Sequence, residues 1–426
     1  MKFAAPESTR SNASRMRRWS ASGWMTPGLL GVLGLGLITA SYEHTRGNLH
    51  KLRQTVTTKT EGPIVSSGPG GQDPVILRRH LGANDPEPEF LSATLLPGRG
   101  FNLWQLTANI PGRGNVSLLA SPPVANAASL LASTGADENG SASTNFGAAF
   151  LAPWAGQMAG SPAPGAGVLQ TEWQGQRLAF PSSSPGSSLS VEGLLLDRGA
   201  DDLKITPQPD GQLAQATFHA GSFGGSWPSN TDITISVQLS GHAVDLTVTA
   251  QNIGTAAEPF GIGWHPFFAI PAGPRAAATL VIPSTTRLSA PNARPHPSTV
   301  PQLSYDDSQS GFVRAGGTKL GDVSLDESYI DLHAGVLADG PIAELRDPAA
   351  GYGVRITPLS NNVKTFRVIA PANKSWVSIG PNMNIPDPLG LEWKTLDSNG
   401  MVTLQPGDSV QWKVRLEIFS VPGSTE

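Results

Sequence analysis

Short segments that alternate apolar and polar residues, separated by turn residues, constrain the fold of this chain most. The alternation is clearest in Asp232–Leu239 and His242–Gln251. Because successive side chains of a strand point to opposite faces, this period of two predicts strands buried on one face. No segment beyond the N-terminal one shows the long 3.6-residue period that is typical of helices.

Similar segments continue from about residue 89 to residue 419, with turn signals such as Pro97-Gly98-Arg99-Gly100 between them. The chain of 426 residues contains 48 glycines and 37 prolines, which supply the turns that many short strands need. Residues 121–147, rich in Ala, Ser, Gly and Asn, are expected to form a long loop. The pattern predicts an all-β fold, a large antiparallel β-sandwich. Its expected strands cover residues 90–96, 102–108, 116–120, 168–173, 212–220, 232–239, 242–251, 279–282, 342–346, 353–358, 366–369, 376–379 and 410–419.

The composition excludes several classes of function. The chain has no cysteine, so a thiol nucleophile, a disulfide and cysteine-ligated zinc are impossible. Its net charge is −4, and its lysines and arginines form no basic stripe, so we expect no nucleic-acid partner. The motifs of triad hydrolases, zinc proteases and phosphate-binding loops are missing from the sequence.

The N-terminal segment predicts export. Arg15, Arg17 and Arg18 precede an apolar run of about 17 residues, which is short for a membrane span. We therefore assign residues 1–40 to a signal peptide or membrane anchor, which would place the protein in the periplasm or on the membrane. A buried helix is the alternative, but four glycines and one proline make the run a poor helix. Polar residues 41–87 are expected to be a linker, and residues 88–422 the sandwich domain.

One histidine has unusual surroundings. His265 lies in Gly261-Ile262-Gly263-Trp264-His265-Pro266-Phe267-Phe268, directly after the alternating strands. Aromatic neighbours would hold the imidazole rigidly, as a general acid or a sugar-binding donor requires. The same surroundings would also hold an ordinary buried histidine, so the segment alone leaves both interpretations open.

The order of several segments resembles the aldose 1-epimerase (galactose mutarotase-like) family over residues 89–419. The resemblance implies a supersandwich of antiparallel strands with a sugar cleft, and a reaction that interconverts the anomers of an aldose without a metal or other cofactor. The segments that carry it are 96–100, 147–156, 261–268, 324–332, 377–381 with 386–390, and 404–409.

Carried over residue by residue, the resemblance makes His265 the general acid and Asp326 a substrate-binding carboxylate. Three other positions depart from the family's pattern. Gly380 stands where the family has its glutamate base, Glu192 where it has a first histidine, and Gln157 where it has an arginine. The resemblance makes Gln157 a candidate for binding substrate at that position. A solvated acid at a turn is the alternative for Asp326.

These departures leave two functions open. Either the chain still interconverts anomers with a relocated base, or it binds a sugar or glycan without catalysis. Glu192 is the first candidate for that base, although it could also be a surface acid near a turn; Glu327 and Glu392 are weaker candidates. Trp154 and Trp264 are expected to stack on sugar rings, with core packing as the alternative.

Overall fold

The computed structural model describes residues 68–79, 86–165, 167–270, 275–284, 286–289, 303–304, 317–334, 340–390, 393 and 398–422. Chain contacts divide the protein into two units, residues 1–65 and 66–426, and every described residue belongs to the second unit. The predicted signal or anchor at residues 1–40 lies outside the described residues. Within the described part of the chain, no helix is long and apolar enough to span a bilayer.

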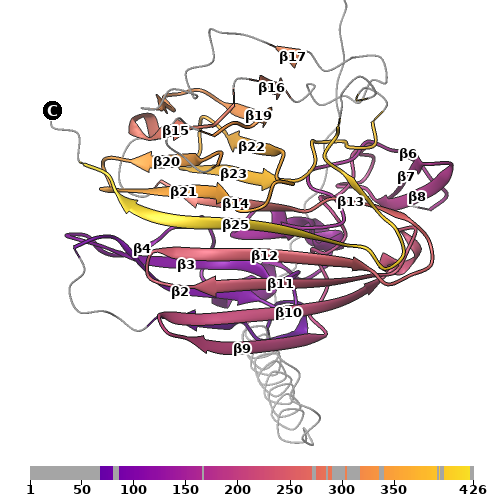
Figure 1. Cartoon of the computed structure of the whole chain (residues 1–426), viewed down its shortest axis with the longest axis horizontal. Coiled ribbons are helices and arrows are strands. Elements are labelled where there is room, and N and C mark those ends of the chain that lie inside the picture. The colour runs from indigo at the N-terminus through magenta and orange to yellow at the C-terminus, as the bar shows by residue number, and fades with distance from the viewer. Residues whose placement is uncertain are drawn as a thin grey trace, which may run out of the picture. The chain divides into compact units, whose positions relative to one another are not determined.

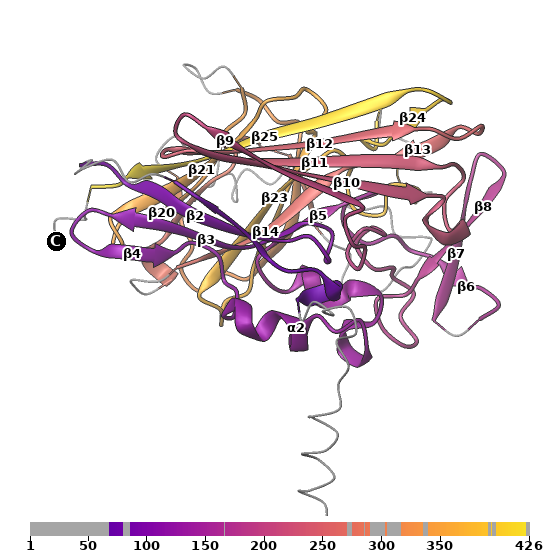
Figure 2. The same ribbon diagram turned by 90° about the horizontal axis from the view of Figure 1, so that it is seen from below.

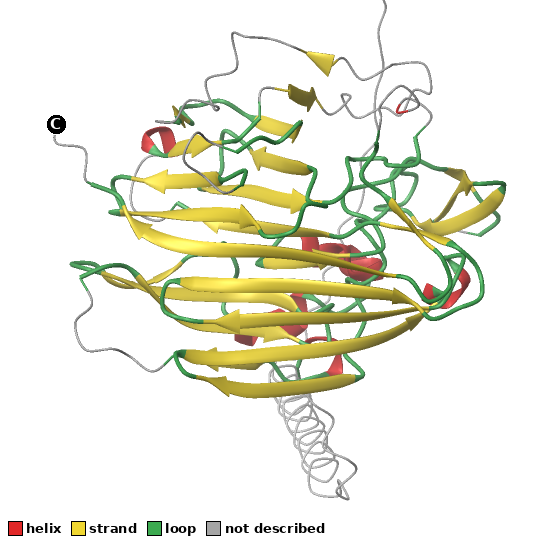
Figure 3. Ribbon diagram, in the orientation of Figure 1, coloured by secondary structure: helices red, strands yellow, loops and turns green. Residues whose placement is uncertain are grey.

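β-strands are the predominant regular structure of the described chain, as the alternating segments predict (Figure 3). Its largest sheet has nine strands among the described residues, all paired antiparallel. In spatial order they are β18 (Thr318–Lys319), β15 (Thr279–Val281), β20 (Ala343–Asp347), β21 (Tyr352–Pro358), β25 (Ser409–Ser420), β12 (Ala243–Asn252), β11 (Thr231–Leu239), β10 (Gly211–Gly221) and β9 (Asp202–Gln208).

A second sheet, with seven strands in the part of the chain that is described, carries the segments singled out above. Its order is β17 (Leu303–Ser304), β16 (Thr286–Ser289), β19 (Leu325–Ile330), β22 (Thr365–Ala370), β23 (Trp376–Asn382), β14 (Gly263–Ala269) and β5 (Ala148–Leu151). Figures 1 and 2 show the nine-stranded sheet lying across these strands. This arrangement confirms the predicted sandwich.

Three smaller sheets complete the described fold. They are β1 (Val75–Arg78) with β2 (Glu89–Leu96), β3 (Asn102–Ile110) and β4 (Gly114–Ser117); β6 (Ser161–Pro162) with β7 (Val168–Trp173) and β8 (Gln176–Pro181); and β13 (Glu258–Phe260) with β24 (Val402–Leu404). Strand β1 lies within residues 41–87, the predicted linker. Val75 and Leu77 bury their side chains while β1 pairs with β2, so the folded part of the chain begins before residue 88.

The core lies between the two large sheets. In β11, residues 233, 235, 237 and 239 are fully buried and the polar residues between them are not, which is the predicted alternation. Their side chains belong to the same buried cluster as Trp264, Val368 and Ile379 of the seven-stranded sheet. One face of that sheet therefore packs on the core, and the opposite face is left for other roles.

The core also encloses a carboxyl group. The side chain of Glu258 is fully buried, and the hydroxyl of Thr231 lies 2.9 Å from each of its oxygens. Burial raises the pKa of Glu258 to about 7, although the hydrogen bond from Thr231 works in the opposite direction.

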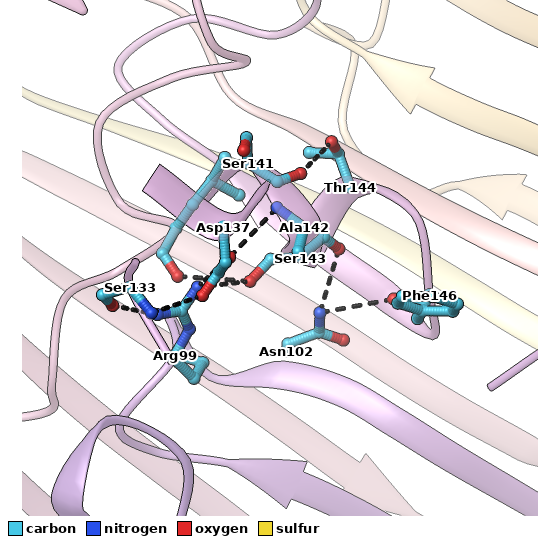
Figure 4. A network of polar contacts seen from close by, with 10 residues as sticks. Arg99, Asn102, Ser133, Asp137, Ser141, Ala142, Ser143, Thr144 and Phe146 are labelled. Carbon is cyan, nitrogen blue, oxygen red and sulfur yellow. Dashed lines mark hydrogen bonds and ion pairs between the residues drawn. The ribbon is translucent and has the colours of Figure 1, made fainter. Parts of the chain in front are cut away.

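The expected loop at residues 121–147 contains short helices instead: η2 (Val124–Asn126), α2 (Ala127–Leu130) and η3 (Gly135–Thr144). A buried ion pair holds this segment, because Nη2 of Arg99 lies 2.8 Å from Oδ1 of Asp137 (Figure 4). Asp137 also accepts the backbone N–H groups of Ser133 and Ala142, at 2.7 and 3.1 Å. The remaining 3₁₀ turns are η1 (Pro69–Gly71), η4 (Phe223–Gly225) and η5 (Arg275–Ala277).

Candidate functional site

Strand β14 places His265 on the face of the seven-stranded sheet that is turned away from the core. Trp264 and Phe268 point into the core, and the indole N–H of Trp264 donates to the carbonyl of Ala148 at 3.2 Å. His265 and Phe267 therefore share the opposite face. Their rings stack at 4.7 Å between centroids, with 25° between the planes. The aromatic segment thus packs directly against the imidazole.

Glu192 meets His265 from a separate segment of the chain. Its Oε2 lies 2.9 Å from Nδ1 of His265, and the two side chains are 13% and 8% exposed. Gly193, at φ +80°, brings this segment close to the end of β5, where the N–H of Leu194 donates to the carbonyl of Ala152 at 2.7 Å. A side chain at Gly193 would collide with that same carbonyl, because its Cβ would lie 2.6 Å from the oxygen.

The carboxylate decides which imidazole nitrogen can exchange protons. An ionised carboxylate only accepts, so Nδ1 of His265 must carry a hydrogen and Nε2 is the acceptor of the neutral ring. Burial alone would raise the pKa of Glu192, but the neighbouring His265 and Arg367 outweigh burial and lower it. Glu192 is therefore charged at neutral pH. We call Glu192 and His265 the dyad.

The other nitrogen of the ring has no partner. Nε2 of His265 is buried and makes no hydrogen bond within the described residues. Three further buried polar atoms on the neighbouring strands share this property: Nε of Arg367, Oγ1 of Thr365 and Oγ of Ser378. Folded proteins pair nearly all buried polar groups, so such a group of atoms on one sheet suggests a polar ligand.

Asp326 lies on strand β19 and not at a turn. Its side chain is 56% exposed, and its Oδ1 lies 2.6 Å from Nη2 of Arg367 on the adjacent strand β22. Arg367 was not among the predicted site residues. The available signal was a lone arginine in the apolar strand Phe366–Ile369, but its partner on another strand could not be read from spacing.

Gly380 lies between Arg367 and His265. It pairs with Arg367 in the register of β22 and β23. On its other side, the pairs Gly263↔Asn382 and Phe267↔Ser378 set Gly380 level with His265 of β14. A Cβ at Gly380 would lie only 2.8 Å from the backbone oxygen of Trp264. The position of the family's base thus has no carboxylate and little room for one.

Two of the other predicted site residues pack in the core and do not face the dyad. Trp154 and Trp264 are fully buried, and Trp154 stacks on Trp227 at 5.2 Å between ring centroids. Neither ring can offer a face to a sugar, so core packing replaces the predicted stacking role for both. Gln157 is half-buried, and its carbonyl accepts the N–H of Asp387 at 2.9 Å. Its predicted contact with substrate stays a prediction.

One of the weaker base candidates points away from the dyad. Glu327 follows Asp326 on β19 and so points to the opposite face, where it pairs with Arg287 and accepts the hydroxyl of Tyr329 at 2.8 Å. Glu392 lies outside the described residues. In the described part of the chain, no three His, Asp or Glu side chains are arranged to hold a metal ion.

Comparisons with known proteins identify the fold. No family model matches the chain, and no curated protein matches it significantly. Among solved structures, it is similar to a galactose mutarotase-like protein from Clostridium acetobutylicum, with 15% identity, a TM-score of 0.62, and coverage of 82% of this chain and 99% of that one. A putative aldose 1-epimerase from Escherichia coli K12 is 12% identical, with a TM-score of 0.57 and coverage of 82% and 100%.

An aldose epimerase homologue from Caenorhabditis elegans is 14% identical, with a TM-score of 0.58 and coverage of 81% and 99%. Identities this low show the fold and not the activity. The described chain therefore has the galactose mutarotase-like sandwich, as the ordered segments of the sequence led us to expect.

Proposed function

We propose that the protein interconverts the α and β anomers of an aldose by acid–base catalysis, with His265 as the group that moves the proton. The observation that carries the proposal is the dyad: Glu192 binds Nδ1 at 2.9 Å, and Nε2 is left without a partner among the described residues. A carboxylate that fixes one nitrogen prepares the other for proton transfer.

The reaction needs one proton to move between two oxygens on the same carbon. Nε2 of neutral His265 takes the proton of the anomeric hydroxyl while the bond from C1 to the ring oxygen breaks and a C1 carbonyl forms. The imidazolium, stabilised by Glu192, then gives the same proton to the former ring oxygen. Rotation about the C1–C2 bond and the reverse steps produce the other anomer. Because one imidazole acts as both base and acid, no carboxylate at Gly380 is required.

This scheme changes the role of Glu192. A carboxylate bonded to Nδ1 of His265 orients the imidazole and does not itself need to reach the sugar. We therefore describe Glu192 as a positioning residue and His265 as the catalytic one. Arg367 and Asp326, at the more exposed end of the same group, offer hydrogen bonds to the sugar hydroxyls.

One observation favours a second candidate function, sugar or glycan binding without turnover. Gly380 replaces the usual base with a residue that cannot take a proton, and the adjacent backbone leaves little room for a side chain. In that case the dyad would serve as a hydrogen-bonding pair in a binding site.

Exchange spectroscopy by NMR separates the two functions. We would measure anomer exchange of D-glucose and D-galactose with the wild type, His265→Gln and, as a control, His219→Gln, which changes an exposed histidine of the other sheet. We expect His265→Gln to lower the catalysed rate by about 10²–10⁴-fold and the control to leave it unchanged. Sugar binding without acceleration over the spontaneous rate would establish the binding function and refute catalysis.

The cellular location is also a proposal. The basic residues and apolar run of residues 1–40 support export, with the sandwich domain in the periplasm or tethered to the membrane. Fractionation of cells that express the full chain with a C-terminal tag tests this proposal, and recovery of the tagged chain from the cytoplasm would contradict it.

A further inference from the structure

Among the residues that the structure describes, the register places one cation beside the dyad on the same sheet, Arg367. Arg367 pairs with Gly380, and β14 sets His265 level with Gly380 on the other side. Side chains at paired positions project from the same face of a sheet. Since Gly380 has no side chain, nothing on β23 stands between the guanidinium and the imidazole.

The charge of Arg367 reaches the dyad across this gap. Together with His265, it favours the ionised form of Glu192 and so lowers the pKa of that carboxyl. The glycine leaves the charge of the arginine to act on Glu192, which binds the imidazole of the next strand.

Asp326 holds the other end of the guanidinium. It binds Nη2 at 2.6 Å, whereas Nε stays buried and unpaired within the described residues. The exposed fractions of the side chains are 56% for Asp326, 17% for Arg367 and 13% for Glu192, so the three charged groups are progressively more buried. One N–H of the arginine is therefore left for a ligand.

We propose that Arg367 is a positioning residue of this site: it keeps Glu192 charged against His265 and offers its Nε–H to a sugar hydroxyl, while Asp326 binds the Nη2 end of the guanidinium. The second part of this role, the contact with sugar, rests on the proposed function. The first part is a property of the folded chain and can be tested without any sugar.

The sugar-free test follows the titration of Glu192. Protein labelled with ¹³C at glutamate carboxyls is titrated by NMR, and the Glu192 signal is assigned by its loss in Glu192→Gln. We expect this titration to move to higher pH in Arg367→Gln and to stay in place in Arg367→Lys, which keeps the charge. Arg415→Gln removes an arginine that pairs with Asp245 on the nine-stranded sheet, and it serves as the control. An unchanged titration in a folded Arg367→Gln variant would overturn the proposal.

The sugar-dependent test follows anomer exchange with D-glucose and D-galactose. Both Arg367→Lys and Arg367→Gln should raise KM at least about fivefold, because a lysine lacks the Nε–H that an arginine presents. Only Arg367→Gln should move the acidic limb of the pH profile to higher pH. A wild-type KM in both variants would overturn the role in binding. If the titration moves as expected but the wild type accelerates no exchange, the proposed function fails and the coupling of Arg367 to Glu192 stands.

Discussion

Substitution of Gly380 tests whether the position that the family resemblance assigns to the base is closed, that is, whether it lacks room for a side chain. In Gly380→Ala, the new Cβ would lie 2.8 Å from the backbone oxygen of Trp264, well inside the 3.4 Å at which ordinary contact begins. A backbone oxygen within a sheet cannot swing aside, so β14 or β23 must shift. Overpacking of this kind costs about 1–3 kcal/mol. Alanine also reduces the conformational entropy of the unfolded chain, which offsets about 0.4–1 kcal/mol of this cost. We therefore expect the free energy of unfolding to fall by about 0.5–2 kcal/mol.

Urea denaturation followed by tryptophan fluorescence measures this loss, with Gly340→Ala as the matched control. At Gly340 the nearest atom to a new Cβ is the oxygen of Pro358 at 3.8 Å, which is an ordinary contact. We expect the control to be as stable as the wild type or slightly more stable. Equal midpoints for the two variants, at equal slopes, would refute the claim that position 380 is closed.

The same reasoning extends to function. Gly380→Glu restores the residue type that the resemblance assigns to this position, but its carboxylate would need the strand shift described above. We therefore expect it to lower stability and not to accelerate anomer exchange. A faster exchange rate in Gly380→Glu than in the wild type would show that the position is open and that the single-histidine scheme is unnecessary.

Three further substitutions have defined outcomes. Glu258→Gln should remove a pH dependence of stability. Because the folded pKa of about 7 exceeds the ordinary 4.5, ionisation of Glu258 lowers the free energy of unfolding of the wild type by about 3 kcal/mol as the pH rises from 4.5 to 7. Urea midpoints measured at pH 5 and pH 8 would reveal this loss. Asp137→Asn should lower the free energy of unfolding by about 3–5 kcal/mol, since it leaves the buried guanidinium of Arg99 unpaired; an unchanged melting temperature would contradict this. Glu192→Gln should slow exchange at least tenfold through a mispositioned His265.

The strand pattern predicted the sandwich because burial on one face leaves a visible period of two. It failed for β9, where Leu203 and Ile205 are 43% and 45% exposed at the edge of the nine-stranded sheet and no clean alternation results. The helices at residues 121–147 were missed for another reason. They depend on the cation of Arg99, whose partner lies 38 residues further along the chain.

The site was predictable only in part. Local context marked His265, and the ordered resemblance brought Glu192 into consideration. Arg367 was missed because its importance comes from cross-strand register, which spacing along one chain does not contain. Trp264 packs in the core because it precedes His265 on β14 and so points to the other face of the sheet, whereas Trp154 follows β5 and stacks on Trp227.

The distances along the chain between the functional groups have a kinetic consequence. Glu192 and His265 are 73 residues apart, and Arg367 and Asp326 are 41 apart, so each contact closes a long loop. Loops of this length close only when the strands between them have been ordered, and folds dominated by such contacts form slowly. We therefore expect binding and exchange activity to appear last during refolding, behind the recovery of β-structure. Proteolytic cleavage of the chain between these strands should abolish activity before the sandwich unfolds.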